Sequence, residues 1–517
     1  MTDQIQPAIR VARGATYLYA QSVIGNLVAV VYFAYAARVL SQTEIGVLAT
    51  LNLIGTLVMI IATLALPAAA TKYIAEYAGK GELQRSKKVH RFTTLFGIAS
   101  AAGFAAVIIA ISPVFSTAIL GGQANQLTVV LLGIDMFPLI LSQFFVGTLT
   151  GLQKFREIAV ATVLQMLIRS TLAILFLAAG QGVQGVVLAW IIGDITGLSL
   201  KAALTIRAFA KTQTSDDIHG RMLFKYSAPL YVSNLVTYFA NQTDKYLVLF
   251  FLTPQLGTEE TLAQLGIYNL ATVAVSVVGM VLSSLATTLF PQLSERLGKE
   301  GKDAVDQASQ MASRYVSIAF IPMAVGLAAV ARPTITLFVG PSYAPGSTAL
   351  AIISVATAVT CLAPLVNSVL LSLGSTRVIM EGSIISIAGA VVAGFPLVRS
   401  TGINGAALTR AALLILGFSY SAYRLAKVHG LHIDRDALGK SCVASAAMAL
   451  AVVPFVLLLQ NRYLLPIYIA IGAAVYLLAV KALHVLQPAD IDLIKNFLPP
   501  QLRGVASKVG AFLVRRA

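Results

Sequence analysis

The octapeptide GVQGVVLA occupies residues 182–189, and a related octapeptide, GINGAALT, occupies residues 402–409. Both copies have glycine at their first and fourth positions, and they lie 220 positions apart. Other matches keep the same interval, since Gly46 in EIGVL corresponds to Gly266 in QLGIY. Weak matches that recur in one common order indicate an internal duplication. We therefore interpret the chain as two copies of one folding unit.

The composition places this duplicated unit in a membrane. The chain is 57% hydrophobic and only 11% charged, and its mean hydropathy is +0.83, whereas an ordinary soluble domain has about 25% charged residues. A bilayer core about 30 Å thick needs roughly 20 apolar residues per helix, so we expect an all-α polytopic membrane protein with about 14 transmembrane helices. The expected spans are 14–38, 44–71, 92–112, 127–150, 159–180, 183–207, 224–252, 262–290, 312–332, 347–373, 378–398, 403–426, 441–460 and 463–483.

The distribution of positive charge predicts the topology. The net charge is +16, and most of the 37 Lys and Arg residues fall in the termini and the even-numbered loops. By the positive-inside rule, we expect a multi-pass cell-membrane protein with both termini in the cytoplasm. The same sidedness argues against a nucleic-acid partner, because a topology signal accounts for the basic residues.

Six spans in each half give both halves the same orientation, which predicts two six-helix lobes related by a pseudo-two-fold axis along the membrane normal. We expect the N-lobe at 1–212 and the C-lobe at 213–432. Two additional spans follow at 433–483. The tail at 484–517 has the apolar and basic pattern of an amphipathic helix on the cytoplasmic membrane surface.

Polar side chains repeat at helical spacing on the first, second, seventh and eighth spans, which predicts polar faces. The seventh span has the densest stripe, comprising Asn234, Thr237, Tyr238, Asn241, Asp244 and Lys245. Asn26 on the first span and Asn269 on the eighth belong to similar stripes. The alternative is that these groups only hydrogen-bond neighbouring helices. We favour a watery cavity for Asp244 and Lys245, because charges at membrane depth are rare unless they face water, a partner or a ligand.

Arg169 and Asp194 suggest a different role. They lie on consecutive antiparallel spans at about the same distance from the connecting loop. An unpaired charge at that depth is costly, so we expect a structural ion pair.

Several catalytic signatures are missing from the sequence. We find no metal-binding His-Glu-His spacing and no phosphate-binding Gly-rich loop, and the outer loops are too short for a catalytic domain. We therefore expect neither an enzyme nor a bound cofactor, while a coupling H⁺ or Na⁺ is left open.

The runs YSAPLYVSNLVTYFANQTDKYLV (226–248) and LGIYNLATVAVSVVGMVLSSLATTLFPQLSE (265–295) resemble the polysaccharide transporter branch of the multidrug/oligosaccharidyl-lipid/polysaccharide exporter superfamily. LFVGPSYAPGSTAL (337–350) and LSLGSTR (371–377) are similar to further family segments. The resemblance covers essentially the whole chain. It implies a flippase of lipid-linked oligosaccharides with a central cavity lined by the first, second, seventh and eighth spans.

We therefore expect a polyprenyl phosphate or pyrophosphate glycan to pass from the cytoplasmic to the outer leaflet by alternating access. Lys245 would attract the anionic head, and Asp244 would orient Lys245 or bind a coupling cation. The asparagines Asn234, Asn241, Asn26 and Asn269 would hydrogen-bond sugar hydroxyls. Membrane lipids and glycan-assembly enzymes are the expected partners.

The alternative is a proton- or sodium-coupled exporter of drugs or other small amphiphiles. Related drug exporters carry an acidic residue in the first span, which here has Asn26 but no acid. A major-facilitator transporter and an acceptor-sugar transferase rank lower, because their loop motif and outer catalytic loops are missing.

Overall fold

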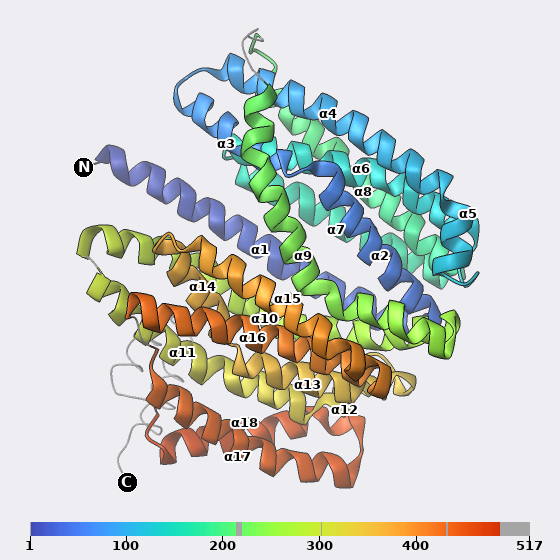
Figure 1. Ribbon diagram of the computed structural model, residues 1–517, viewed down its shortest axis with the longest axis vertical. Coiled ribbons are helices and arrows are strands. Elements are labelled where there is room, and N and C mark those ends of the chain that lie inside the picture. The colour runs from blue at the N-terminus through green and yellow to red at the C-terminus, as the bar shows by residue number, and fades with distance from the viewer. Residues whose placement is uncertain (1, 214–219, 301, 431–432, 486–517) are drawn as a thin grey trace. The chain divides into compact units, whose positions relative to one another are not determined.

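The computed structural model describes residues 2–213, 220–300, 302–430 and 433–485, and these residues form a bundle of helices without strands (Figure 1). The chain divides into two compact units, Met1–Leu270 and Ala271–Ala517, which we call the N-terminal and C-terminal units. The expected cytoplasmic tail falls almost entirely outside the described residues, at 486–517.

The N-terminal unit is built around α6, which packs against α2, α3, α4, α7 and α8, while α1 packs on α7. The helices α4, α6, α7 and α8 run side by side in the upper part of Figure 1. The helices of this unit are α1 (Thr2–Val39), α2 (Gln42–Thr63), α3 (Leu66–Gly79), α4 (Leu83–Ala110), α5 (Ser112–Val114), α6 (Gln126–Gly151), α7 (Phe155–Ala178), α8 (Gly182–Phe209), α9 (Gly220–Leu256) and the first part of α10 (Thr258–Glu300).

The C-terminal unit has its main apolar core between α11, α13, α14 and α16. Two smaller clusters hold α17 and α18 against α11 and α12. Besides the rest of α10, its helices are α11 (Lys302–Ala329), α12 (Ala331–Phe338), α13 (Gly346–Val359), α14 (Ala363–Ser372), α15 (Thr376–Thr401), α16 (Ile403–His429), α17 (Arg435–Leu459) and α18 (Leu465–Ala482).

The repeated octapeptides begin the second helix of two hairpins, α7–α8 and α15–α16. Gly182 and Gly402 have φ values of 54° and 59° at these turns, a conformation that glycine adopts at little cost. The second glycine of each copy allows the preceding helix to approach. A Cβ on Gly405 would lie 2.0 Å from the carbonyl oxygen of Leu397, and one on Gly185 would lie 2.8 Å from Cβ of Phe176. The same hairpin is therefore built twice.

The expected count of fourteen spans is not confirmed. Among the described residues, 12 helices are long and apolar enough to cross a membrane, or up to 13 when the bent pair α13 and α14 counts as one span. The seventh expected span coincides with α9, which is not among them. Its polar stripe and its charged residues lower its apolar content, so length and composition do not mark it as a span.

The second expected span, 44–71, is broken into α2 and α3. Leu64 and Ala65 have φ values of 45° and 54°, and Pro67 follows in the first turn of α3. A left-handed backbone ends a helix, and proline cannot continue the preceding hydrogen-bond ladder. The hydropathy of the segment conceals this break because both sides of it are apolar.

The first turns of α2 and α10 cross at two glycines, Gly46 and Gly266. A Cβ on Gly46 would lie 1.8 Å from the carbonyl oxygen of Leu262, and one on Gly266 would lie 2.2 Å from that of Gln42. Because 42 and 262, like 46 and 266, differ by 220, the two contacts are equivalent under exchange of the repeats. A two-fold axis between the matched segments produces such reciprocal contacts. The lobe boundaries at 1–212 and 213–432 stay predictions.

Replacing Gly266 with alanine is expected to destabilise the protein by about 1–3 kcal/mol, because the added methyl group must push α2 and α10 apart. The thermal unfolding midpoint of the purified protein in detergent measures this effect. Gly103→Ala on α4 is the matched control, since no atom lies within 4 Å of the methyl position and alanine is the better helix former. Equal midpoints for the two variants would contradict the close crossing.

Candidate functional site

All eight candidate residues from the sequence lie in the N-terminal unit, on α1, α7, α8, α9 and the first part of α10. On α9, Asn234 and Asn241 are exposed. Asn241 donates a hydrogen bond from Nδ2 to the carbonyl oxygen of Thr237, one turn earlier, at 2.8 Å. This end of the polar stripe therefore presents amide groups at the surface of α9.

Tyr238, in the middle of the same stripe, contacts α2. Its hydroxyl group donates to the carbonyl oxygen of Leu53 at 2.6 Å and lies 2.9 Å from the hydroxyl oxygen of Tyr246. Tyr238 is buried. Part of the stripe thus serves as hydrogen-bonding contact between helices, which is the alternative that the sequence left open.

Two consecutive residues of α9 bond two consecutive residues of α10. Tyr268 donates from its hydroxyl group to Oδ2 of Asp244, and Lys245 donates from Nζ to Oδ1 of Asn269 at 3.0 Å. Asp244 is fully buried, whereas Lys245 is half-buried. The structure therefore brings Lys245 and Asn269 together, and it places the Asp244 carboxylate in the contact between α9 and α10.

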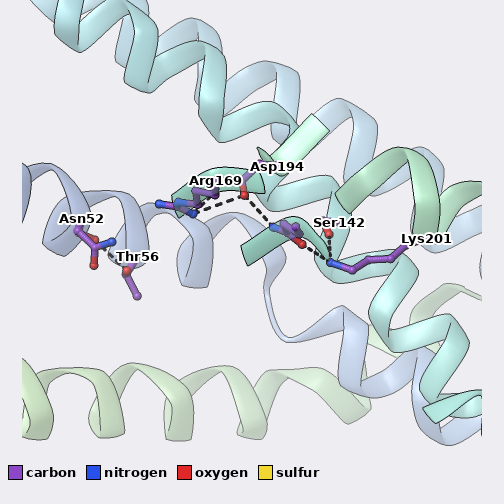
Figure 2. A network of polar contacts seen from close by, with 7 residues as sticks. Asn52, Thr56, Ser142, Arg169, Asp194 and Lys201 are labelled. Carbon is purple, nitrogen blue, oxygen red and sulfur yellow. Dashed lines mark hydrogen bonds and ion pairs between the residues drawn. The ribbon is translucent and has the colours of Figure 1, made fainter. Parts of the chain in front are cut away.

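The polar stripes of α1 and α2 bond their own helices. Asn26 donates from Nδ2 to the carbonyl oxygen of Ser22 at 2.8 Å, and Thr56 donates to that of Asn52 at 2.8 Å (Figure 2). Such bonds satisfy polar donors inside an apolar environment without a second helix. Asn52 is exposed, whereas Asn26 is partly buried.

Arg169 and Asp194 form the expected ion pair between α7 and α8. Nη1 of Arg169 lies 3.3 Å from Oδ2 of Asp194, and its guanidinium stacks over Trp190 at 4.6 Å. Gln165 donates from Nε2 to Oδ1 of Asp194 at 2.7 Å. Asp194 is 0% exposed, so Arg169 and Gln165 provide the hydrogen bonds that a buried carboxylate requires.

The network continues to Lys201, which the sequence analysis missed. Its Nζ donates to Oε1 of Gln165 at 2.7 Å and to Oγ of Ser142 at 2.9 Å (Figure 2). Lys201 is only 3% exposed, so its ammonium group is buried with these two neutral partners. Its spacing from Asp194, two helical turns along α8, is the signal that would have placed both on one face.

No group of three or more His, Cys, Asp or Glu side chains in the described part of the chain is arranged to hold a metal ion. The candidate residues form two groups, the bonded pairs between α9 and α10 and the buried network of charged and polar side chains on α6, α7 and α8.

Comparison with known proteins finds a family and two relatives of similar length. Residues 11–296 match the family model described as polysaccharide biosynthesis protein. The probable low-salt glycan biosynthesis flippase Agl15 of Haloferax volcanii is 21% identical over 467 residues, which cover 90% of this chain and 94% of Agl15. Lipid II flippase MurJ of Bacillus subtilis is 24% identical over 475 residues, which cover 82% of this chain and 86% of MurJ.

Solved structures show the same fold. A lipid II flippase MurJ in an inward closed conformation superposes with a TM-score of 0.65 and 14% identity, covering 91% of this chain and 98% of that one. An inward-facing multidrug resistance transporter of the MATE family gives a TM-score of 0.60 and 14% identity, covering 79% and 96%. With its family model spanning more than half of its length, this multi-pass membrane chain belongs to the family described as polysaccharide biosynthesis protein.

Proposed function

We propose that the protein is a flippase that moves a lipid-linked oligosaccharide, on polyprenyl phosphate or pyrophosphate, from the cytoplasmic to the outer leaflet. Family membership and two relatives named as flippases support this class. Two lobes that rock about a central site would alternate access, as the repeated hairpins and the reciprocal α2–α10 contact suggest. The polar head crosses while the lipid tail stays in hydrocarbon.

The observation that carries the proposal is Lys245, a half-buried cation on α9 whose Nζ donates a hydrogen bond to Oδ1 of Asn269 at 3.0 Å. An ammonium group can donate charge-assisted hydrogen bonds, and phosphate oxygens accept them. Asn234, Asn241 and Asn26 offer amide groups that suit sugar hydroxyls. Asp244 holds α9 against α10 through Tyr268, and so positions Lys245.

Flipping in liposomes tests this proposal. The purified protein is reconstituted with a fluorescent polyprenyl-pyrophosphate oligosaccharide, and a membrane-impermeant quencher reports how much lipid has changed leaflet. We expect protein-dependent flipping of this lipid and no efflux of a small cationic dye from the same liposomes.

A second function, the coupled export of small amphiphiles, is favoured by the likeness of the fold to MATE transporters. That likeness, at 14% identity, concerns the fold alone. Transport of the dye without flipping of the lipid would favour this function and would contradict ours. Neither function involves an enzymatic reaction, and glycan-assembly enzymes remain proposed partners of the flippase.

Both termini are proposed to lie in the cytoplasm, supported by the one-sided distribution of Lys and Arg. Single cysteines that replace Lys87 and Lys427 are expected to react with a membrane-impermeant thiol reagent only from the cytoplasmic side. Cysteines that replace Gln123 and Glu259 are expected to react only from outside. A reversed pattern at either pair would overturn the orientation.

A further inference from the structure

One buried acid in the N-terminal unit has no role in the proposed substrate site. Asp135 on α6 is 1% exposed, and its Oδ1 has no hydrogen-bond partner among the residues that the structure describes. Its carboxyl group lies within hydrogen-bonding reach of the carboxyl group of Asp194 on α8. A carboxylate only accepts hydrogen bonds, so a bond between the two groups requires a proton on one of them.

Cationic side chains surround this carboxyl pair. Arg169 on α7 bonds Asp194, and Lys201 reaches Asp194 through Gln165 (Figure 2). Lys201 in turn donates to Ser142 on α6. The pair therefore lies within a network of polar groups that connects α7 and α8 to α6.

The acidic groups on α2 and α3, which also pack against α6, have partners of their own. The carboxylate of Glu44 accepts a hydrogen bond from the backbone N–H of Ser41 at 2.8 Å, and Glu76 on α3 pairs with Lys80 at 2.7 Å. On α4, Nδ1 of His90 lies 3.0 Å from Oγ1 of Thr148, far along α6 from Asp135. Arg169, Asp194 and Lys201 are thus the charged groups of this network that bear on Asp135.

We propose that Asp135 and Asp194 share one exchangeable proton, and that its uptake and release couple transport to a proton gradient. The role in coupling rests on the proposed flippase function, whereas the shared proton does not. A metal cation would meet the positive charges of Arg169 and Lys201, whereas a proton needs only one carboxylate oxygen. With the proton, two cations face a single carboxylate. Without the proton, the two cations face two carboxylates. The net charge buried between α6, α7 and α8 therefore differs by one between the two states.

A change of one charge in such a place favours different packing of the helices in the two protonation states. The proton then shifts the population between conformations, because it binds them with different affinity. Asp135 is a positioning and proton-binding group in this scheme, and it touches no lipid-linked substrate.

Infrared difference spectroscopy of the purified full-length protein tests the shared proton directly. We expect the wild type to show a carbonyl stretching band of a protonated carboxyl that disappears as the pH is raised. This band should be absent in Asp135→Asn, shifted in its titration in Asp135→Glu, and unchanged in the control Asp436→Asn, whose carboxyl is at the surface of α17. A band that persists in Asp135→Asn, or that follows added Na⁺ instead of pH, would overturn the proposal.

Flipping in liposomes with an imposed pH difference tests the coupling. We expect the gradient to accelerate flipping of the fluorescent lipid by the wild type and by Asp436→Asn, and to leave the rate of Asp135→Asn unchanged. An equal response of Asp135→Asn and the wild type would show that the pair does not couple transport. Absence of flipping by every variant, the wild type included, would refute the flippase function, while the infrared result would still decide on the shared proton.

Discussion

Asp194→Ala is expected to lower the free energy of unfolding by about 3–5 kcal/mol, the usual cost of removing one partner from a buried ion pair. Asp194 is fully buried and accepts hydrogen bonds from Arg169 and Gln165. Its removal takes away the carboxylate that Arg169 bonds directly and that Lys201 reaches through Gln165. The thermal unfolding midpoint in detergent measures the loss.

A double variant separates the ion pair from simple loss of packing. Asp194→Asn with Arg169→Gln removes both charges and leaves a hydrogen-bonding amide at each position, so its midpoint should recover most of the loss. Asp436→Ala is the control, because that carboxylate is 75% exposed beside Lys440 and surface pairs contribute about 0–1 kcal/mol. A midpoint for Asp194→Ala equal to that of the control would show that the pair contributes little.

Most helices could be predicted because each needs a long apolar segment, and apolar segments are visible in a sequence. α9 shows the limit of that signal. Its polar residues include candidate site residues, and they also lower its hydropathy below that of the other spans. The break at Leu64 and Ala65 was hidden for another reason. It depends on backbone conformation, and the flanking residues are apolar on both sides.

The candidate site was predicted in part, and for similar reasons. Arg169 and Asp194 could be paired from the sequence because two antiparallel helices joined by a short loop bring equal depths together. Gln165 and Lys201 were missed since their role depends on which face of α7 and α8 turns inward. Tyr268 was missed as the partner of Asp244 because the rotation of α10 about its axis decides whether Tyr268 or a neighbouring residue meets α9.

The reciprocal contact at Gly46 and Gly266 connects the repeat in the sequence with the packing of the helices. The repeat was recognised from isolated glycines, and a duplicated glycine suggests only that the position has a structural cause. The structure supplies the cause, which is a crossing of α2 and α10 too close for a Cβ on either helix. The same crossing fixes the first turns of α10, and hence the position of Asn269 beside Lys245.

Lys245→Gln is expected to reduce flipping of the anionic lipid by about tenfold or more, with little change in thermal stability. A hydrogen bond to a charged group contributes about 1.5–3 kcal/mol, and each 1.4 kcal/mol corresponds to roughly tenfold. Glutamine still donates a hydrogen bond to Oδ1 of Asn269, so the contact between α9 and α10 is kept. Lys245→Arg should retain part of the activity, because it keeps the charge but changes the geometry.

Two comparisons distinguish a substrate-binding lysine from a structural one. Asn269→Asp places a carboxylate beside Lys245 and should suppress flipping without loss of stability, because it neutralises the charge offered to the lipid. Lys440→Gln, which removes a surface lysine paired with Asp436, should flip as the wild type does. If Lys245 instead neutralises Asp244, Lys245→Gln would lower the unfolding midpoint and Lys245→Gln with Asp244→Asn would restore it. That rescue would refute the role in binding the phosphate, whereas normal stability with flipping lost only for the anionic lipid, and kept for a neutral analogue, would support it.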